Sequence, residues 1–151
     1  MTVHDAAAYI LESGGEMTAM KLQKLVYYSQ CWSLVWDEVP LFDEGIEAWA
    51  NGPVCPDLYA AHKGKFKVGP GSIPGDSSQL DADQKATVDE VMKFYGVKSA
   101  QWLSDLTHLE APWKDARARA GAVEGQNCRE EISLSAMHEY YSGLRAEPEK
   151  A

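Results

Sequence analysis

One stretch of the chain is apolar on nearly every side of a helix. Between Met17 and Trp36, apolar residues recur at i, i+3, i+4 and i+7 along two adjoining stripes. This spacing predicts a helix over residues 18–36, capped by Thr18, that is buried on two sides and lies inside a helical bundle. The two stripes are Leu22, Leu25, Val26, Ser29, Trp32 and Trp36, and Tyr27, Cys31, Leu34 and Val35.

The polar positions of this helix form one narrow strip, which we expect to face solvent or a partner. A polar strip flanked by aromatic side chains is typical of the centre of a protein interface. An ordinary solvated helix edge is the alternative interpretation. The strip consists of Lys21, Gln23, Lys24 and Gln30, with Tyr27 and Tyr28 beside it.

Helical periodicity and end signals mark several further segments. Each has an apolar face and begins or ends at a capping residue, a glycine or a proline. They run from Thr2 to Gly14, from Pro56 to Gly64, from Leu80 to Tyr95, from Ser99 to Glu110 with Trp102, Leu103 and Leu106 inward, around Trp113 and Ala116, and from Ser133 through Met137, Tyr140, Tyr141 and Leu144.

Turn-forming residues separate these helices. Residues 46–50 are either a strand or a half-turn, and residues 51–57 form a turn because Asn and Gly tolerate positive φ and Pro fixes φ. A short β-hairpin near 46–68 is therefore one interpretation. Residues 65–78 are rich in glycine and proline and predict a mobile surface loop.

Together these elements predict a mainly α fold. We expect a single compact domain of about six helices around the central helix, because 151 residues with 45% hydrophobic content bury a sizeable core. The domain is expected to span residues 1–146. Residues 147–151 are predicted to be a frayed, charged tail.

Charge disfavours direct binding to nucleic acid. The chain has 23 acidic and 14 basic residues, a formal net charge of -9, and its basic residues occur in short separate groups. Such a chain repels a phosphate backbone. The acidic surplus instead suits a basic protein partner.

The cysteines and the hydropathy indicate a reducing, aqueous environment. The three cysteines, Cys31, Cys55 and Cys128, have no paired spacing, so a disulfide framework is not expected. No basic, apolar leader and no apolar run of membrane-spanning length is present in this sequence. We therefore expect a cytoplasmic protein with no membrane association.

Residues with catalytic potential are few. No His or Cys spacing fits a metal site, and no phosphate-binding loop is present, so we expect no cofactor. Cys55 is interpreted as a packed residue in preference to a nucleophile. Asp105 and His108 lie three residues apart on one helix face, but a histidine near a helix end is also stabilised there without chemistry.

Three blocks of sequence occur in an order that points to a known family. The first is Lys21 to Tyr28, the second is Phe42 to Trp49 followed by Gly52-Pro53-Val54 and Tyr59, and the third is Leu103 to His108 followed by Pro112-Trp113. In this combination the chain, from about Val3 to Tyr141, resembles the Panacea domain, also called the SocA-like or GepA-like domain.

The resemblance implies a mostly helical, non-enzymatic, cytoplasmic antitoxin of a bacterium or prophage. Such a domain would belong to a type II-like toxin-antitoxin system and would neutralise, by stoichiometric contact, a toxin protein encoded nearby. The partner-binding residues that it implies, some of which can equally belong to the core, are Lys21, Gln23, Lys24, Tyr27, Tyr28, Trp49, Gly52, Pro53, Val54, Asp105, Thr107 and His108.

Two alternative functions remain open at the level of sequence. A proteolytic adaptor would bind a partner and deliver it to a protease, so the partner's level would fall. A small hydrolase would use Asp105 and His108, or Cys55, but this pair lacks an evident third member. The oligomeric state is not indicated by the sequence.

Overall fold

The structure is a computed structural model that describes the backbone of residues 1–150 and the side chains of residues 1–144. The frayed tail predicted for residues 147–151 therefore lies outside the fully described residues. The helices within the described backbone are α1 (Val3–Gly14), α2 (Ala19–Trp36), α3 (Pro56–His62), η1 (Ser77–Gln79), α4 (Ala82–Phe94), α5 (Ala100–Leu109), α6 (Ala111–Arg119) and α7 (Leu134–Lys150).

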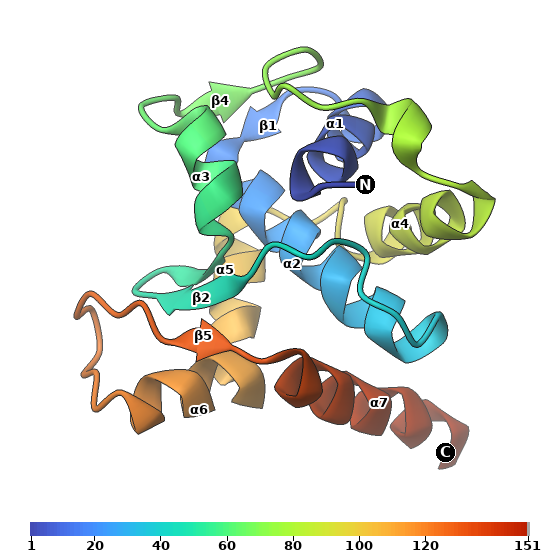
Figure 1. Cartoon of the computed structure of the whole chain (residues 1–151). Coiled ribbons are helices and arrows are strands. Elements are labelled where there is room, and N and C mark those ends of the chain that lie inside the picture. The colour runs from blue at the N-terminus through green and yellow to red at the C-terminus, as the bar shows by residue number, and fades with distance from the viewer. Residues whose placement is uncertain (151) are drawn as a thin grey trace.

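The helix α2 lies at the centre of the molecule, as predicted. It contacts helices α1, α3, α4, α5 and α7 and strands β1 (Met17–Thr18) and β3 (Gly52–Val54), and Figure 1 shows it crossing the middle of the fold. The Thr18 hydroxyl accepts a hydrogen bond from the Lys21 N–H at 3.2 Å, which confirms the predicted cap. The mainly helical, single-domain prediction is confirmed.

Burial along α2 is more complete than the sequence pattern suggested. Every residue from Leu22 to Cys31 is buried, including all polar ones. Trp36, predicted to lie in the core, is instead 39% exposed because it occupies the last turn and stacks on Trp32 with ring centroids 5.0 Å apart. The centre of the bundle is thus the middle of α2, not its C-terminal end.

Two small antiparallel sheets flank the helices. One has the order β3-β2-β5 and the other pairs β1 with β4. The β2–β3 hairpin agrees with the predicted position, with Trp49 opposite Gly52 at its end. The pairing of β5 with β2, which brings residues 131 and 132 beside residues 46 and 47, was not predicted. The strands are β1 (Met17–Thr18), β2 (Ile46–Trp49), β3 (Gly52–Val54), β4 (Lys67–Val68) and β5 (Glu131–Ile132).

The segment 65–78 is more firmly attached than a mobile loop. Its strand β4 pairs with β1, and Ile73 within it is only 3% exposed. The Asp76 N–H donates to the Asp5 side chain at 2.8 Å. The apolar Ile73, surrounded in sequence by glycine and proline, anchors this segment against the body of the domain.

Helices α4, α5 and α7 begin close to their predicted first residues. The hydroxyl of Ser99 caps α5, accepting from the Trp102 N–H at 3.0 Å, and that of Ser133 accepts from the Ala136 N–H at 3.0 Å. Trp102 was predicted to face inward but is 39% exposed. Its ring lies instead under the ammonium group of Lys98, 4.7 Å away.

Candidate functional site

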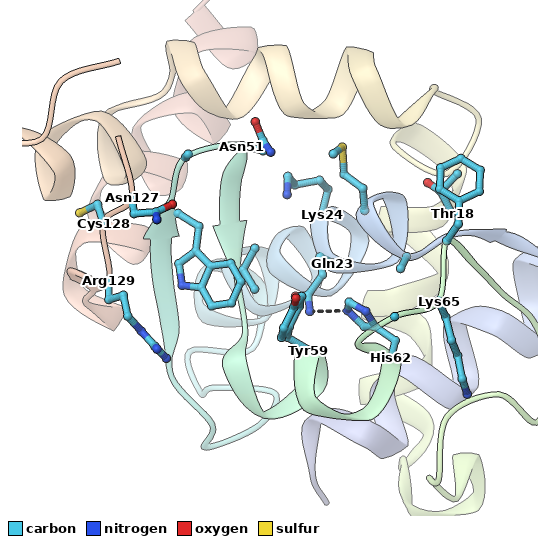
Figure 2. Close-up of a pocket in the computed structure, with 17 residues that line it drawn as sticks. Thr18, Gln23, Lys24, Asn51, Tyr59, His62, Lys65, Asn127, Cys128 and Arg129 are labelled. Carbon is cyan, nitrogen blue, oxygen red and sulfur yellow. Dashed lines mark hydrogen bonds between the residues drawn. The ribbon is translucent and has the colours of Figure 1, made fainter. Parts of the chain in front are cut away.

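A pocket of about 700 Å³ opens where the N-terminal half of α2 meets the β2–β3 hairpin and α3. Its volume is within the range of ligand pockets. Figure 2 shows residues from these elements converging on it, with residues 127–129 on one side and Lys65 on the other. The lining residues are Thr18, Ala19, Met20, Gln23, Lys24, Trp49, Ala50, Asn51, Val54, Tyr59, His62, Gly64, Lys65, Phe66, Asn127, Cys128 and Arg129.

Four of the predicted partner-binding residues line this pocket, and four more lie immediately around it. Gln23, Lys24, Trp49 and Val54 are lining residues. Pro53 accepts a hydrogen bond from Lys24, and the others belong to the hairpin or to the adjoining face of α5. The fold therefore brings together parts of all three sequence blocks. The four surrounding residues are Gly52, Pro53, Thr107 and His108.

The Lys24 side chain is the most unusual feature of the pocket. It is 1% exposed, and its Nζ donates a hydrogen bond to the Pro53 carbonyl oxygen at 3.2 Å. No carboxylate among the described side chains lies within ion-pair distance of it. Burial lowers the pKa of Lys24 from its ordinary value of 10.5 to about 7. A buried ammonium group without a carboxylate destabilises the fold.

Gly52 allows the hairpin to approach the Lys24 side chain. Its φ is 124°, a conformation that side-chain-bearing residues rarely adopt. A Cβ on this residue would lie 2.5 Å from Cε of Lys24 and 3.1 Å from Oγ1 of Thr107. The position thus requires glycine both for conformation and for space.

The hairpin backbone is held by side chains from neighbouring helices. The Ser104 hydroxyl of α5 donates to the Asn51 carbonyl at 2.7 Å. From α6, the Trp113 indole donates to the Trp49 carbonyl at 2.8 Å, and Arg117 donates to the Ala48 carbonyl at 3.0 Å. These bonds fix the hairpin relative to α5 and α6, and the Lys24–Pro53 bond joins it to α2.

Gln23 and His62 form a polar part of the pocket wall. The Gln23 side chain accepts from the Cys55 N–H at 2.9 Å, and its Nε2 lies 2.9 Å from Nε2 of His62 (Figure 2). Because the amide NH₂ is a donor, His62 Nε2 acts as the acceptor in this pair. Burial lowers the pKa of His62 below its ordinary value. A neutral His62 therefore agrees with the observed geometry.

Aromatic side chains continue this wall, because Tyr59 packs on His62 with ring centroids 5.3 Å apart. Trp49 packs edge-to-face on Tyr59 with ring centroids 5.0 Å apart, and the Arg129 guanidinium lies 5.7 Å from the Trp49 ring centroid. Glu47 accepts hydrogen bonds from the Trp49 indole at 2.8 Å and from Arg129 at 3.1 Å. At the rim, Phe66 is 76% exposed. The pocket thus combines an apolar wall with cationic groups.

The prediction of a solvent-facing strip on α2 is wrong for three of its four members. Gln23, Lys24 and Gln30 are each at most 3% exposed, and only Lys21 reaches the surface in part. Gln30 is buried because its side chain donates to the Phe42 carbonyl at 2.8 Å and accepts from the Leu41 N–H at 2.7 Å. These polar side chains satisfy neighbouring backbone groups instead of meeting water.

Tyr27 and Tyr28 belong to the core and not to an exposed surface. The Tyr28 hydroxyl donates to the Glu110 carboxylate at 2.7 Å, and the Tyr141 hydroxyl donates to the same oxygen at 2.8 Å. Tyr27 and Tyr141 share a hydrogen bond of 3.1 Å between their hydroxyl groups. Burial raises the pKa of Glu110 above its ordinary value. This cluster joins α2, α7 and the start of α6.

The residues considered for catalysis do not assemble into a catalytic group. Asp105 is exposed and accepts a hydrogen bond from Gln101, whereas His108 stacks on Trp113 with ring centroids 4.0 Å apart. Burial raises the pKa of the Cys55 thiol to about 11, which opposes thiolate formation. Within residues 1–144, no group of three or more His, Cys, Asp or Glu side chains is arranged to hold a metal ion.

Several lining residues were absent from the predicted set. Phe66 is a lone aromatic residue within a segment rich in Lys, Gly and Pro, and this contrast was an available signal. His62 lies one helical turn after Leu58 and gives no signal in sequence. Arg129 reaches the pocket only because the segment leading into β5 lies beside β2.

Comparison with known proteins identifies the family. None of the helices in the described part of the chain has the length and apolar content of a membrane span. Neither the curated proteins nor the solved structures give a match. A family model described as antitoxin SocA-like, Panacea domain, matches residues 22–114, which include most of the pocket. The match covers more than half of the sequence, so this chain belongs to the SocA-like antitoxin, Panacea domain family.

Proposed function

We propose that this domain is the antitoxin of a type II-like toxin-antitoxin system and neutralises a cognate toxin by stoichiometric binding. Membership of the SocA-like antitoxin family is the observation that carries the proposal. The toxin is expected to be a protein encoded nearby. Contact with it would block the toxin's active site or its substrate entry, and no chemistry by this domain is required.

The pocket and its rim are the proposed contact surface. A standard interface buries about 800 Å² on each partner, which is larger than a single pocket mouth. The exposed side chains around the mouth would therefore take part, and large apolar residues of this kind often dominate binding energy. The rim offers Met20 at 38% exposure and Phe66 at 76%. Lys21, partly exposed one residue after Met20, would extend this surface.

Of the remaining predicted contact residues, Asp105 is exposed on α5 and is available to a partner. Tyr27 and Tyr28 would act indirectly, by holding α2 in place through their bonds to Tyr141 and Glu110. Gly52 and Thr107 would position Lys24 and the hairpin. This division assigns contact to the pocket wall and support to the residues behind it.

Growth of cells that express the neighbouring open reading frame, with and without this protein, tests the proposal. We expect toxicity to be relieved by this protein, and the two proteins to co-purify as a stable complex. Relief accompanied by disappearance of the neighbour's protein, without a stable complex, would favour a proteolytic adaptor instead. A harmless neighbour that does not bind would contradict the proposal.

A further inference from the structure

The lining of the pocket has a charge opposite to that of the whole protein. The chain carries a formal net charge of -9, yet its pocket is lined by Lys24, Lys65 and Arg129 and by no Asp or Glu. Arg129 is neutralised in part by Glu47, 3.1 Å away. Lys24 and Lys65 have no carboxylate within ion-pair distance among the described side chains. The pocket therefore suits an anionic occupant.

The Lys24 ammonium group has more hydrogen-bond donors than its contact with the hairpin uses. It provides one hydrogen bond, to the Pro53 carbonyl, although an ammonium group has three donors. Two neighbouring hairpin carbonyls, those of Asn51 and Trp49, accept from neutral groups of Ser104 and Trp113. A neutral donor is thus sufficient at two hairpin carbonyls, whereas a third, that of Ala48, accepts from the Arg117 guanidinium. The two remaining donors, and the charge of the protonated form, are left for a partner.

Other walls of the pocket include apolar and aromatic side chains. Val54, Trp49 and Tyr59 line the pocket, and Met20 and Phe66 stand at its exposed rim. Figure 2 shows the Lys24 side chain extending from α2 towards the hairpin residue Asn51, while Tyr59 lies beside His62. An occupant that complements both the Lys24 amine and the apolar lining carries a carboxylate next to an apolar side chain.

We propose that the Lys24 pocket is a receptor for an acidic residue of the partner protein, held beside an apolar residue of the same partner. The carboxylate would accept from the free donors of Lys24, and the neighbouring apolar side chain would pack between Trp49 and Phe66. This inference rests on the proposed function, because it assigns the toxin as the source of the carboxylate. A basic toxin is compatible with it, since only one acidic residue is required.

A pair of charge-removing variants tests the inference. Lys24→Met keeps the length and most of the volume of the side chain but removes the charge. Lys63→Met is the matched control, because Lys63 is exposed on the neighbouring α3 end and does not line the pocket. Affinity for the co-purified toxin is measured by titration calorimetry, and folding is checked by circular dichroism.

We expect Lys24→Met to weaken the complex by at least about tenfold, since a hydrogen bond between two charged groups is lost. Lys63→Met should leave the affinity within about twofold. Each Asp and Glu of the toxin is then changed to Asn or Gln. One of these changes should reproduce the loss, and combining it with Lys24→Met should weaken binding no further.

Two results would overturn the inference while leaving the proposed function intact. One is a Lys24→Met variant that binds the toxin as tightly as the wild type. The other is a set of toxin variants of which none couples to Lys24, together with saturable binding of N-acetylphenylalanine but not of its amide. That pattern would assign the pocket to a free carboxylate. Absence of any complex with the wild-type domain would instead overturn the proposed function and this inference together.

Discussion

Replacing Lys24 by methionine should stabilise the isolated domain near neutral pH. The folded pKa of Lys24 is about 7, against 10.5 ordinarily, so folding opposes protonation of this amine. At about 1.4 kcal/mol for each pKa unit, and with the folded amine about half deprotonated at pH 7, burial of this residue costs about 4 kcal/mol of folding free energy at that pH. Methionine avoids this cost.

The gain is reduced by the loss of one hydrogen bond. Without Lys24, the buried carbonyl of Pro53 has no donor from this side chain, which costs about 1–3 kcal/mol. We therefore expect Lys24→Met to raise the free energy of unfolding by about 1–3 kcal/mol at pH 7. Most core substitutions destabilise a protein, so a gain of this size would point directly to the cost of the buried charge.

The pH dependence gives the sharper test. Between about pH 7 and pH 10.5 the unfolded chain holds the Lys24 proton more than the folded one does, so this residue adds stability to the wild type as pH rises. The difference between variant and wild type should shrink by about 3 kcal/mol from pH 7 to pH 9.5. In the difference between variant and wild type, the contributions of the other titrating groups to the pH dependence cancel. His108 is the exception, because its charge interacts with that of Lys24.

Urea unfolding of both proteins at pH 7 and pH 9.5, followed by circular dichroism, measures this difference. A Lys24→Met variant that is several kcal/mol less stable at pH 7, or a difference that does not change with pH, would refute the reasoning. Either result would mean that the Lys24 amine is solvated or paired with a carboxylate. The stability cost would then offer no reason to assign Lys24 to binding.

Three further predictions follow from contacts behind the pocket. Gly52→Ala should destabilise the domain by about 2 kcal/mol or more in a thermal melt, because its φ is 124° and its Cβ would overlap Lys24. Because the pKa of Glu110 is raised above its ordinary value of 4.5 in the folded state, the free energy of unfolding of the wild type should fall as pH rises from 4 to 7. Glu110→Gln should remove this fall, as urea unfolding across that pH range would measure. Cys55, with its thiol pKa raised to about 11, should react with iodoacetamide at pH 8 only after denaturation, as mass spectrometry would detect.

The hydrophobic pattern was sufficient to predict the helices and the place of α2. Buried apolar stripes at helical spacing require neighbours on both sides, and this constraint is local enough to read in sequence. The β2–β3 hairpin was one of the interpretations left open, and residues 52–54, predicted to form a turn, are strand β3 because they pair with β2. The third strand β5 was missed because it has two residues and gains its partner from a segment more than 80 residues away.

The burial of the polar residues on α2 could not be inferred from the hydrophobic pattern. Lysine and glutamine are ordinarily solvent-exposed, so their periodic placement indicated a surface strip. Gln23 and Lys24 are buried because hairpin and loop backbone groups, which are distant in sequence, accept and donate their hydrogen bonds. Such contacts depend on the tertiary arrangement. Eight of the twelve residues that the family resemblance implies lie in or around one pocket, whereas Tyr27 and Tyr28 belong to the core.

Two variants at equally exposed positions, one at the pocket and one outside its lining, test most directly whether the domain neutralises its toxin through this pocket. Phe66 and Val97 are each 76% exposed, and only Phe66 lines the pocket. Both are changed to aspartate, and the affinity for the toxin and the relief of toxicity are measured. We expect Phe66→Asp to weaken binding by about 30-fold or more and to abolish relief, with Val97→Asp unchanged. Equal affinities for the two variants and the wild type would contradict a toxin interface at this pocket.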